Sequence, residues 1–428
     1  VILLVTGVRI AYPRSHTEGG ARACEHGGRR MTTIEHLDLS ALIAADTAHL
    51  IHPLHLPTAH RQTGPIVLDR GEGALLWDVQ GREYIDGLAG LWNVVVGHGR
   101  RELAEAAAMQ MSRLAFCSSY NGQSNVPAIR LAARLAEIGY PSLNTTFFTS
   151  GGAESNESAF KLARFYWKRL GKPDKVKIIS RYYAYHGVTI AAMSATGIPP
   201  YWEAFDPRAP GFLHVEAPYR FRCPHPNDDP SCPGHFTWAL EEAILREGPE
   251  TVAAFIAEPV MGAGGVIVPP DDYFPRVRAI CDQYDVLLIA DEVITGFGRT
   301  GKRFALEHWI VEPDIMSFAK AITSGYFPLG GIMLSDKIAD VLRNLPPDSP
   351  WMHAYTYSAH PTGCAVALRN LAIIEDERLI ERAATLGQRL LRQLHQLAAS
   401  SRLIGEVRGL GLMAAVEFGE RETRKPFP

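Results

Sequence analysis

The sequence predicts an α/β protein, with a mostly parallel sheet in a large domain and a smaller α+β domain built from the two chain ends. Two observations lead to this class. Short, continuous apolar runs, typical of strands buried on both faces, alternate with segments of helical pattern. The chain also has 428 residues, which is enough for two or three domain-sized cores.

The N-terminal third is expected to combine helices with short strands. The pattern at 34–49 is that of an amphipathic helix, and glycine turns punctuate strand-like runs within 66–86. Two helices should follow. The first, at 101–115, is rich in Ala, Glu and Met. The second, at 126–138, carries Pro127 near its start, where proline is tolerated.

The rest of the chain is expected to alternate strands and helices. Helical patterns occupy 155–170 and 365–397. Short apolar runs bounded by turns predict strands at 145–149, 177–180, 252–258, 286–291, 315–319, 331–334 and 409–418. The last of these strands belongs naturally to the smaller domain.

We expect four segments along the chain. Residues 1–30 should be disordered or lie upstream of the true start, because they are rich in Gly, His, Arg and Ser after a short apolar run. Residues 31–80 then form the N-terminal part of the small domain, 81–335 the large domain, and 336–428 the C-terminal part of the small domain. We expect that last part to be truncated.

Composition narrows the function. Hydrophobic residues make up 46% of the chain and charged residues 21%, which is ordinary for a globular enzyme. The net charge of −3 gives no sign of a nucleic-acid surface, and the apolar run at 1–10 is too short to span a membrane. That run also lacks the flanks of a signal peptide. Six dispersed cysteines predict a reducing compartment, so we expect a cytoplasmic protein.

One lysine and one aspartate carry the strongest chemical signal. Lys320 ends an apolar run and precedes a glycine-bearing turn, and Asp291 closes the buried strand at 286–291. An isolated buried charge is costly, so each needs a partner. Burial also lowers the pKa of a lysine until its amine can act as a nucleophile. The pair suits an aldehyde cofactor whose ring nitrogen is to be protonated, and we predict pyridoxal 5'-phosphate (PLP).

A turn at 149–157 is a candidate anion site. The strand at 145–149 ends there in Ser150-Gly151-Gly152-Ala153, and a helix follows. Small residues allow close backbone approach, and the N–H groups at a helix N-terminus bind phosphate. An ordinary strand-to-helix turn would have the same appearance.

Two further strand ends carry functional side chains. Tyr185 and His186 follow the strand at 177–180, and an aromatic ring there can stack on a planar cofactor. Glu258 ends the strand at 252–258. Because ligands bind at the carboxyl edge of a parallel sheet, we expect Glu258, Asp291 and Lys320 to share one cleft. Taken singly, Tyr185 could be a core residue and Glu258 a structural carboxylate.

These motifs, spread from about Gly71 to Phe418, resemble those of the class III (omega) aminotransferases, which are fold-type I PLP enzymes. The stretches Asp-Glu-Val-Ile-Thr-Gly-Phe-Gly-Arg-Thr-Gly at 291–301 and Phe-Ala-Lys at 318–320 carry the resemblance. It implies a homodimer or a dimer of dimers that moves an amino group from an ω-amine or ω-amino acid to pyruvate.

The resemblance also implies residue roles. Lys320 would hold the cofactor as a Schiff base, and Asp291 would pair with its ring nitrogen. Tyr185 and Val293 would pack on opposite ring faces. The other residues of the cofactor site would be Gly151, Gly152 and Ala153 at the phosphate, His186 and Glu258 beside the ring, and Thr356 reaching the phosphate of the neighbouring subunit.

The predicted substrate pocket follows the amine:pyruvate-like branch. A tryptophan at the position of Trp92 lines the pocket in that branch, and Phe116, Tyr120 and Ala263 are further candidates. An aromatic wall favours an uncharged or extended amine. Trp92 could instead be an aromatic residue of the core. In the family, a stretch beyond 413–418 commonly supplies an arginine for the substrate carboxylate, and we expect this chain to end before it.

Three alternatives remain open from sequence. The same scaffold supports other PLP chemistry, such as decarboxylation or an aminomutase reaction, and a truncated homologue could bind PLP with little activity. Cys223, His225, Cys232 and His235 could form a zinc site, but their spacing matches no familiar pattern. We therefore predict no metal there and expect a surface or dimer-contact loop.

Overall fold

The computed structural model describes residues 38–54, 64–120, 122–223 and 232–420. They fall into two compact units, one within residues 3–87 and one from residue 88 onward. The expectations for residues 1–30 and for the very end of the chain lie outside the described residues. So does His225 of the zinc alternative. No helix in the described part is long and apolar enough to cross a membrane.

The first unit contains one helix and a small antiparallel sheet. The helix α1 (Leu39–His49) starts at Leu39 because the Asp38 side chain accepts hydrogen bonds from the first backbone amides. Strands β1 (Leu68–Glu72), β2 (Leu75–Asp78) and β3 (Glu83–Ile85) pair in that order. The buried Asp78 carboxylate holds the β2–β3 turn by accepting from Arg82 Nε at 2.6 Å and from the Tyr84 hydroxyl at 2.8 Å.

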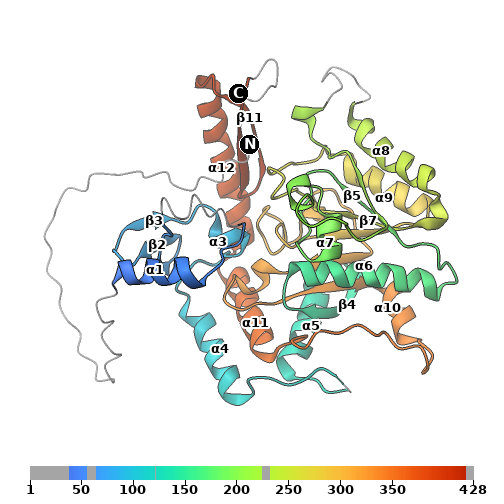
Figure 1. Cartoon of the computed structure of the whole chain (residues 1–428), viewed down its shortest axis with the longest axis horizontal. Coiled ribbons are helices and arrows are strands. Elements are labelled where there is room, and N and C mark those ends of the chain that lie inside the picture. Colours follow the sequence, from blue (N-terminus) through green and yellow to red (C-terminus); the bar gives the residue numbers. More distant parts are fainter. Residues whose placement is uncertain (1–37, 55–63, 121, 224–231, 421–428) are drawn as a thin grey trace, which may run out of the picture. The chain divides into compact units, whose positions relative to one another are not determined.

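A seven-stranded sheet organises the second unit (Figure 1). Its order is β4-β10-β9-β8-β7-β5-β6. The pairs from β9 to β6 are parallel, and β10 runs antiparallel to both of its neighbours. The predicted mostly parallel α/β fold is therefore confirmed. The strands are β4 (Leu143–Thr149), β5 (Lys177–Arg181), β6 (Phe212–Val215), β7 (Val252–Ala257), β8 (Leu287–Asp291), β9 (Ile315–Phe318) and β10 (Gly330–Ser335).

Helices cover both faces of this sheet. The α-helices of this unit are α3 (Ala89–Trp92), α4 (Arg101–Arg113), α5 (Val126–Ile138), α6 (Gly152–Arg169), α7 (Ile190–Ala195), α8 (Cys232–Glu247), α9 (Tyr273–Gln283), α10 (Asp336–Arg343), α11 (Pro361–Asp376) and α12 (Leu379–Ser400). Short 3₁₀ turns are η1 (Pro199–Tyr201), η2 (Arg220–Arg222), η3 (Pro249–Thr251), η4 (Ala305–His308) and η5 (Lys320–Thr323).

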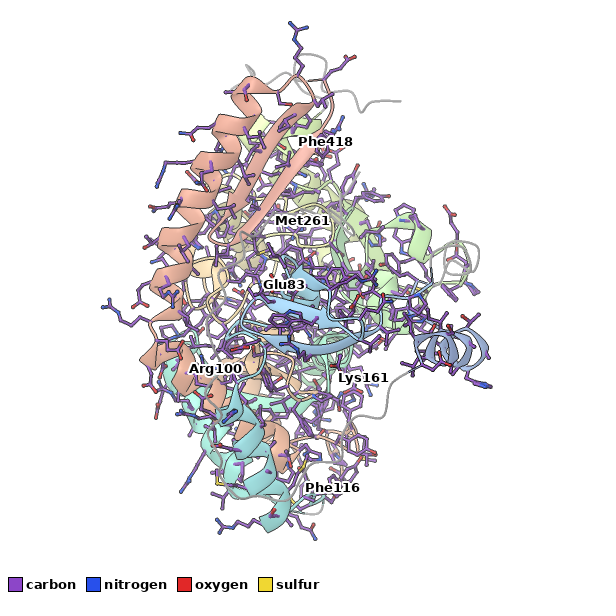
Figure 2. The ribbon with its side chains drawn as sticks, turned by 90° about the vertical axis from the view of Figure 1, so that its left-hand side faces the viewer. Glu83, Arg100, Phe116, Lys161, Met261 and Phe418 are labelled. Carbon is purple, nitrogen blue, oxygen red and sulfur yellow. The ribbon has the colours of Figure 1, made fainter. Side chains whose placement is uncertain are left out.

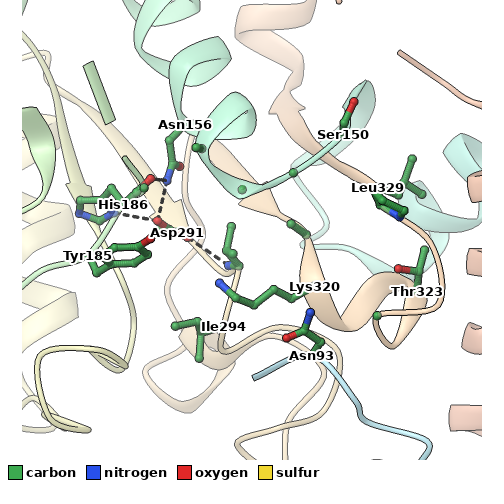
Figure 3. A pocket seen from close by; sticks show the side chains of 18 of the residues that line it. Asn93, Ser150, Asn156, Tyr185, His186, Asp291, Ile294, Lys320, Thr323 and Leu329 are labelled. Atoms are coloured by element: carbon green, nitrogen blue, oxygen red, sulfur yellow. Dashed lines mark hydrogen bonds and ion pairs between the residues drawn. The ribbon is translucent and has the colours of Figure 1, made fainter. Parts of the chain in front are cut away.

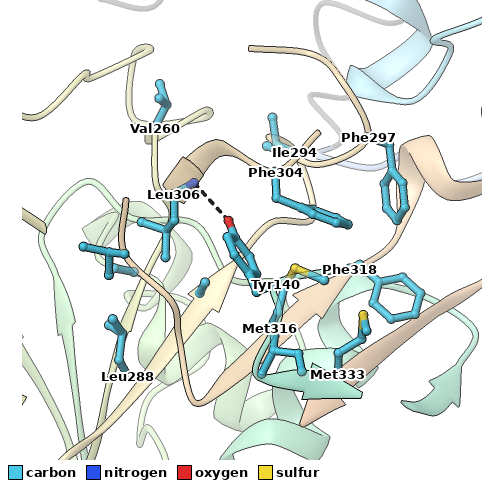
Figure 4. Close-up of a cluster of buried hydrophobic side chains, with 14 of the residues drawn as sticks. Tyr140, Val260, Leu288, Ile294, Phe297, Phe304, Leu306, Met316, Phe318 and Met333 are labelled. Carbon is cyan, nitrogen blue, oxygen red and sulfur yellow. Dashed lines mark hydrogen bonds between the residues drawn. The ribbon is translucent and has the colours of Figure 1, made fainter. Parts of the chain in front are cut away.

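Side chains alternate between two cores along the central strands. In β8, Ile289 packs with α6 residues such as Phe160 in one core. Leu288 points to the opposite core, which includes α5 residues such as Leu135 (Figure 4). This period of two on strands buried throughout explains why the sequence shows continuous apolar runs rather than polar alternation.

The C-terminal part differs from the sequence prediction in two places. The region expected to be helical, 365–397, contains two helices, α11 and α12, and Arg378 between them adopts a left-handed backbone with φ of 50°. The strand expected at 409–418 instead spans the end of the first strand, the turn and the second strand of a hairpin. Its strands are β11 (Ile404–Leu410) and β12 (Met413–Phe418), and the chain reverses at Gly411, where φ is 58°. The helix α12 packs along this hairpin (Figure 1).

The sheet brings distant segments to one edge. The parallel strands β5, β7, β8 and β9 all end there. The strand β4 ends at the same edge, because Thr149 pairs with Gly330 at the start of β10. The residues that follow these strand ends therefore lie together at this edge, as expected from the sequence.

Candidate active site

A cavity of about 370 Å³ lies at this edge of the sheet (Figure 3). Its volume is that of a small-molecule site. Most of the predicted cofactor residues line it: Gly151, Gly152, Ala153, Tyr185, His186, Glu258, Asp291, Val293 and Lys320.

The other predicted residues are not among those that line this cavity. Trp92 is adjacent in sequence to Asn93, which does line it. Ala263 follows Gly262, whose backbone contacts Glu258. Phe116, Tyr120 and Thr356 are exposed at the surface of the chain.

Lys320 lies in a turn that is held by hydrogen bonds from distant parts of the chain. Its backbone is left-handed, with φ of 47°, at the start of η5. From α11, the buried Asn370 side-chain amide donates to Ala321 O at 2.9 Å and Ile322 O at 3.0 Å. The Ser324 hydroxyl accepts from Val95 N at 2.8 Å. The lysine side chain is thus presented to the cavity by a fixed backbone.

The environment of Lys320 favours a neutral amine. Burial lowers the pKa of its ammonium group, while the carboxylates of Asp291 and Glu258 oppose this shift. Figure 3 shows the side chain extended toward the side of the cavity that holds Asp291. An amine in this state can attack a carbonyl carbon or exchange a proton with a bound substrate.

Asp291, at the end of β8, is only 3% exposed and is held by three donors. Its Oδ2 atom lies 2.8 Å from Asn156 Nδ2 and 2.7 Å from His186 Nδ1. Within the described part of the chain, its Oδ1 atom accepts a single hydrogen bond, from Val293 N at 3.1 Å. The hydrogen bonds fix the carboxylate plane, and Oδ1 keeps capacity for a further donor from the cavity.

Glu258 joins two strand ends. Its Oε1 atom accepts from Tyr185 N at 3.0 Å, and its Oε2 atom accepts from Gly262 N at 2.8 Å. The side chain is nearly fully buried, and burial raises the pKa of its carboxyl. Burial also raises the pKa of the Tyr185 phenol. Glu258 therefore sets the position of the Tyr185 backbone beside the cavity.

A second buried carboxyl follows Asp291 directly. Glu292 is fully buried and accepts hydrogen bonds from the Tyr140 hydroxyl at 2.7 Å, from Ala305 N at 2.7 Å and from the Thr295 hydroxyl. Burial raises the pKa of Glu292 to about 7, against the hydrogen bonds that lower it. Glu292 does not line the cavity and anchors the loop after β8.

The opposite end of the cavity has the chemistry of an anion site. Helix α6 starts at Gly152 without a side-chain cap, so its first amides have no intrahelical partner. The Ser150 hydroxyl oxygen is buried there and has no hydrogen-bond partner among the residues that the structure describes. A Cβ atom on Gly152 would lie 2.8 Å from Val293 Cγ1, so this close approach requires glycine. Unpaired donors at a helix N-terminus fit a phosphate.

Comparison with known proteins agrees with this geometry. A family model described as aminotransferase class-III matches residues 57–427. The chain belongs to the class III aminotransferases. A putrescine–pyruvate aminotransferase of Pseudomonas aeruginosa is 41% identical over 382 residues, which cover 87% of this chain and 82% of that protein. A diaminobutyrate–2-oxoglutarate transaminase of Halomonas elongata is 42% identical over 364 residues, 84% of this chain and 78% of that protein.

Solved structures give the same family. A thermostable (S)-enantioselective omega-transaminase from Thermomicrobium roseum superposes with a TM-score of 0.88 at 53% identity, covering 91% of this chain and 87% of that chain. The omega transaminase from Pseudomonas jessenii in complex with PMP gives 0.86 at 42% identity, covering 90% and 86%. This class III aminotransferase therefore has the fold-type I architecture, and its family uses PLP.

The residues present fit that cofactor. The unpaired Ser150 hydroxyl and the uncapped start of α6 suit its phosphate. The free capacity of Asp291 Oδ1 suits its ring nitrogen, and Lys320 suits its aldehyde carbon. Among the residues described, no group of three or more His, Cys, Asp or Glu side chains is placed to hold a metal ion.

Sequence reasoning missed several residues that line the cavity. Ser150 and Asn156 stand inside the motif 149–157 and could have been predicted from it, whereas Asn93 and Thr323 carry no comparable signal. Asn156 reaches Asp291 across 135 positions of sequence. Such a contact depends on the sheet order and is invisible in a local pattern.

Proposed function

We propose that this aminotransferase moves an amino group from an ω-amine or ω-amino acid to pyruvate in two half-reactions of ping-pong type. The names of its relatives support this choice, because they include a putrescine–pyruvate aminotransferase and several omega-transaminases. Related gamma-aminobutyrate and diaminobutyrate transaminases place terminal amines in the same substrate class.

The observation that carries the proposal is the grouping of three functions in one cavity. Three features line the same cavity. They are Lys320 with its lowered pKa, the Asp291 carboxylate, whose Oδ1 can accept a further hydrogen bond, and the candidate anion site at Ser150. PLP, when bound, supplies an electron sink for the carbon from which a proton is removed.

The side chains of this protein then divide the remaining work. Lys320 would hold the cofactor through its amine, and its free amine would serve as the base that moves the proton. Asp291 would orient the ring nitrogen through Oδ1. Ser150 and the amides of α6 from Gly152 bind the phosphate. Tyr185 and Val293 enclose the ring and exclude water.

We further propose that the active form is a cytoplasmic homodimer. Phe116, Tyr120 and Tyr357 form an exposed aromatic surface, with exposures of 42%, 46% and 59%. The rings of Phe116 and Tyr357 are 6.1 Å apart. Phe116 lies beyond the far end of α4 (Figure 2), away from the cavity lining. This surface includes the loop of Thr356, so a partner could receive all three predicted contacts together.

Hydrogen bonds give this surface a defined shape. The Ser119 hydroxyl donates to Ser358 O at 2.9 Å, and the Asn125 side-chain amide donates to Ala359 O at 2.9 Å. The two segments are therefore presented as one unit. We assign Phe116, Tyr120 and Thr356 to the partner's cavity, while Trp92 and Ala263 stay as predicted substrate contacts of their own subunit. Light scattering should give a dimer mass; a monomer with full activity would refute this assignment.

A half-reaction screen tests the proposed function. The PLP-loaded protein is mixed with β-alanine, putrescine, taurine or 1-phenylethylamine, and the change in cofactor absorbance is followed. We expect conversion with at least one donor and restoration by pyruvate. Product analysis separates amino transfer from decarboxylation or intramolecular transfer, since only amino transfer needs the keto acid. Cofactor absorbance without any donor-dependent change would refute the proposal.

A further inference from the structure

Asn156 has an unusual position in the site. It lies in α6, four residues after Gly152, and is 1% exposed. Its side-chain Nδ2 atom lies 2.8 Å from Asp291 Oδ2 and 2.8 Å from His186 O. Both partners are acceptors, so the amide must turn its NH₂ group toward them, and no other side-chain group of this size offers two donors on one atom.

The contact defines which oxygen of Asp291 serves the cavity. Asn156 and the His186 ring both engage Oδ2, and Oδ1 has a single backbone donor from Val293. Without Asn156, Oδ2 would lose one of its two side-chain donors, and the carboxylate could rotate about its Cβ–Cγ bond. A buried carboxylate compensates a missing donor by moving toward another one.

The same helix also carries the anion site. Gly152 and Asn156 are separated by four residues, or about 6 Å of axial rise. In the same turn, Ser155 Oγ lies 3.1 Å from Phe318 O, at the end of the strand that leads to Lys320. The first turns of α6 therefore touch the phosphate end, the strand of the lysine and the ring-nitrogen carboxylate.

We propose that Asn156 is a positioning residue that fixes the distance between the Asp291 carboxylate and the anion site of α6, so that both ends of one cofactor are engaged together. This inference rests on the proposed function, because it requires the ring nitrogen to meet Asp291. Asn156 acts through Asp291 and does not itself touch the reacting atoms.

The test compares the two ends of the cofactor separately. Asn156→Leu preserves size and removes both hydrogen bonds. The full chain, freed of cofactor, is titrated with PLP, and inorganic phosphate is then used as a competitor. We expect the Kd for PLP to rise roughly 10- to 100-fold, the effect of losing hydrogen bonds to a charged group. The inhibition constant of inorganic phosphate should change less than threefold.

A matched control lies two residues further along α6. Ser158 is also fully buried and its hydroxyl bonds Glu154 O at 2.7 Å and His353 Nε2 at 2.8 Å, away from Asp291. Ser158→Ala should reproduce any general loss of helix stability without the selective loss of PLP affinity. If Asn156→Leu does not fold, Asn156→Ser serves instead, since one short hydroxyl cannot reach both acceptors.

The possible outcomes distinguish a failure of the Asn156 proposal from a failure of the proposed function. If Asn156→Leu weakens the binding of PLP and of phosphate equally, or weakens neither, the positioning role is overturned. Asp291→Ala is measured in parallel. If Asp291→Ala binds PLP and turns over normally, the proposed function of the site fails; if only the Asn156 variants behave like wild type, the inference about Asn156 fails alone.

Discussion

Replacing Gly152 by alanine should disturb the protein even before a cofactor binds. The added Cβ would lie 2.8 Å from Val293 Cγ1 and 3.2 Å from Val293 Cγ2. Rotating the valine relieves the contact only in part, because every staggered rotamer leaves a methyl group at one of these two positions. Its backbone cannot retreat easily either, since Val293 N donates to Asp291 Oδ1.

The magnitude follows from overpacking. Adding a methyl group where it cannot fit costs about 1–3 kcal/mol. Unfolding entropies scale to about 0.9 kcal/mol/K for a chain of 428 residues, so the melting temperature should fall by roughly 1–3 °C.

The neighbouring glycine supplies the control. A Cβ on Gly151 meets no atom of the described residues within 4 Å, and its φ of −175° is extended backbone open to any residue. Gly151→Ala should therefore leave the melting temperature of the cofactor-free protein unchanged or slightly higher. Differential scanning fluorimetry of both variants decides the matter. A Gly152→Ala protein as stable as Gly151→Ala would refute the reasoning.

The remaining predictions concern three other positions. Lys320→Ala should abolish turnover while the protein still folds, and normal turnover by that variant in a donor-plus-pyruvate assay would contradict the scheme. Burial raises the pKa of Glu292 to about 7 from 4.5, so stability from this group is full below pH 4.5 and is lost as pH rises through 7, by about 3 kcal/mol. The melting temperature of Glu292→Gln should thus decline less than that of wild type between pH 5 and 7.5, and parallel curves would show that Glu292 does not titrate there. Thr356→Val should weaken PLP binding roughly tenfold in the dimer by removing one hydroxyl donor, and equal Kd values for both proteins would remove Thr356 from the phosphate site.

Sequence patterns predicted the central strands well because each is apolar over its whole length. The run at 286–291 became β8, and the run at 315–319 became β9. Sequence patterns failed to predict element boundaries where a single residue has a positive φ angle. Arg378 and Gly411 adopt positive φ values that split a helix and reverse a strand. Local propensity does not reveal a left-handed residue when, as at Arg378, the side chain gives no sign of it.

Part of the candidate site could also be predicted from the sequence. Residues at strand ends, such as Lys320 and Asp291, could be expected together because parallel strands end at one edge. Their supporting contacts could not. Asn370 fastens the lysine turn from α11, 49 positions away from Ala321, and Ser324 binds Val95 across 229 positions. These distances are set by the order of the strands, which no local pattern encodes.

The start of α6 has a consequence for how the protein matures. Ser155 and Asn156 meet partners that are synthesised 163 and 135 residues later. The turn reaches these partners only after β8 and β9 have been synthesised. Under the proposed function, the complete cofactor site therefore forms late in synthesis, and bound cofactor indicates that the central sheet has been assembled.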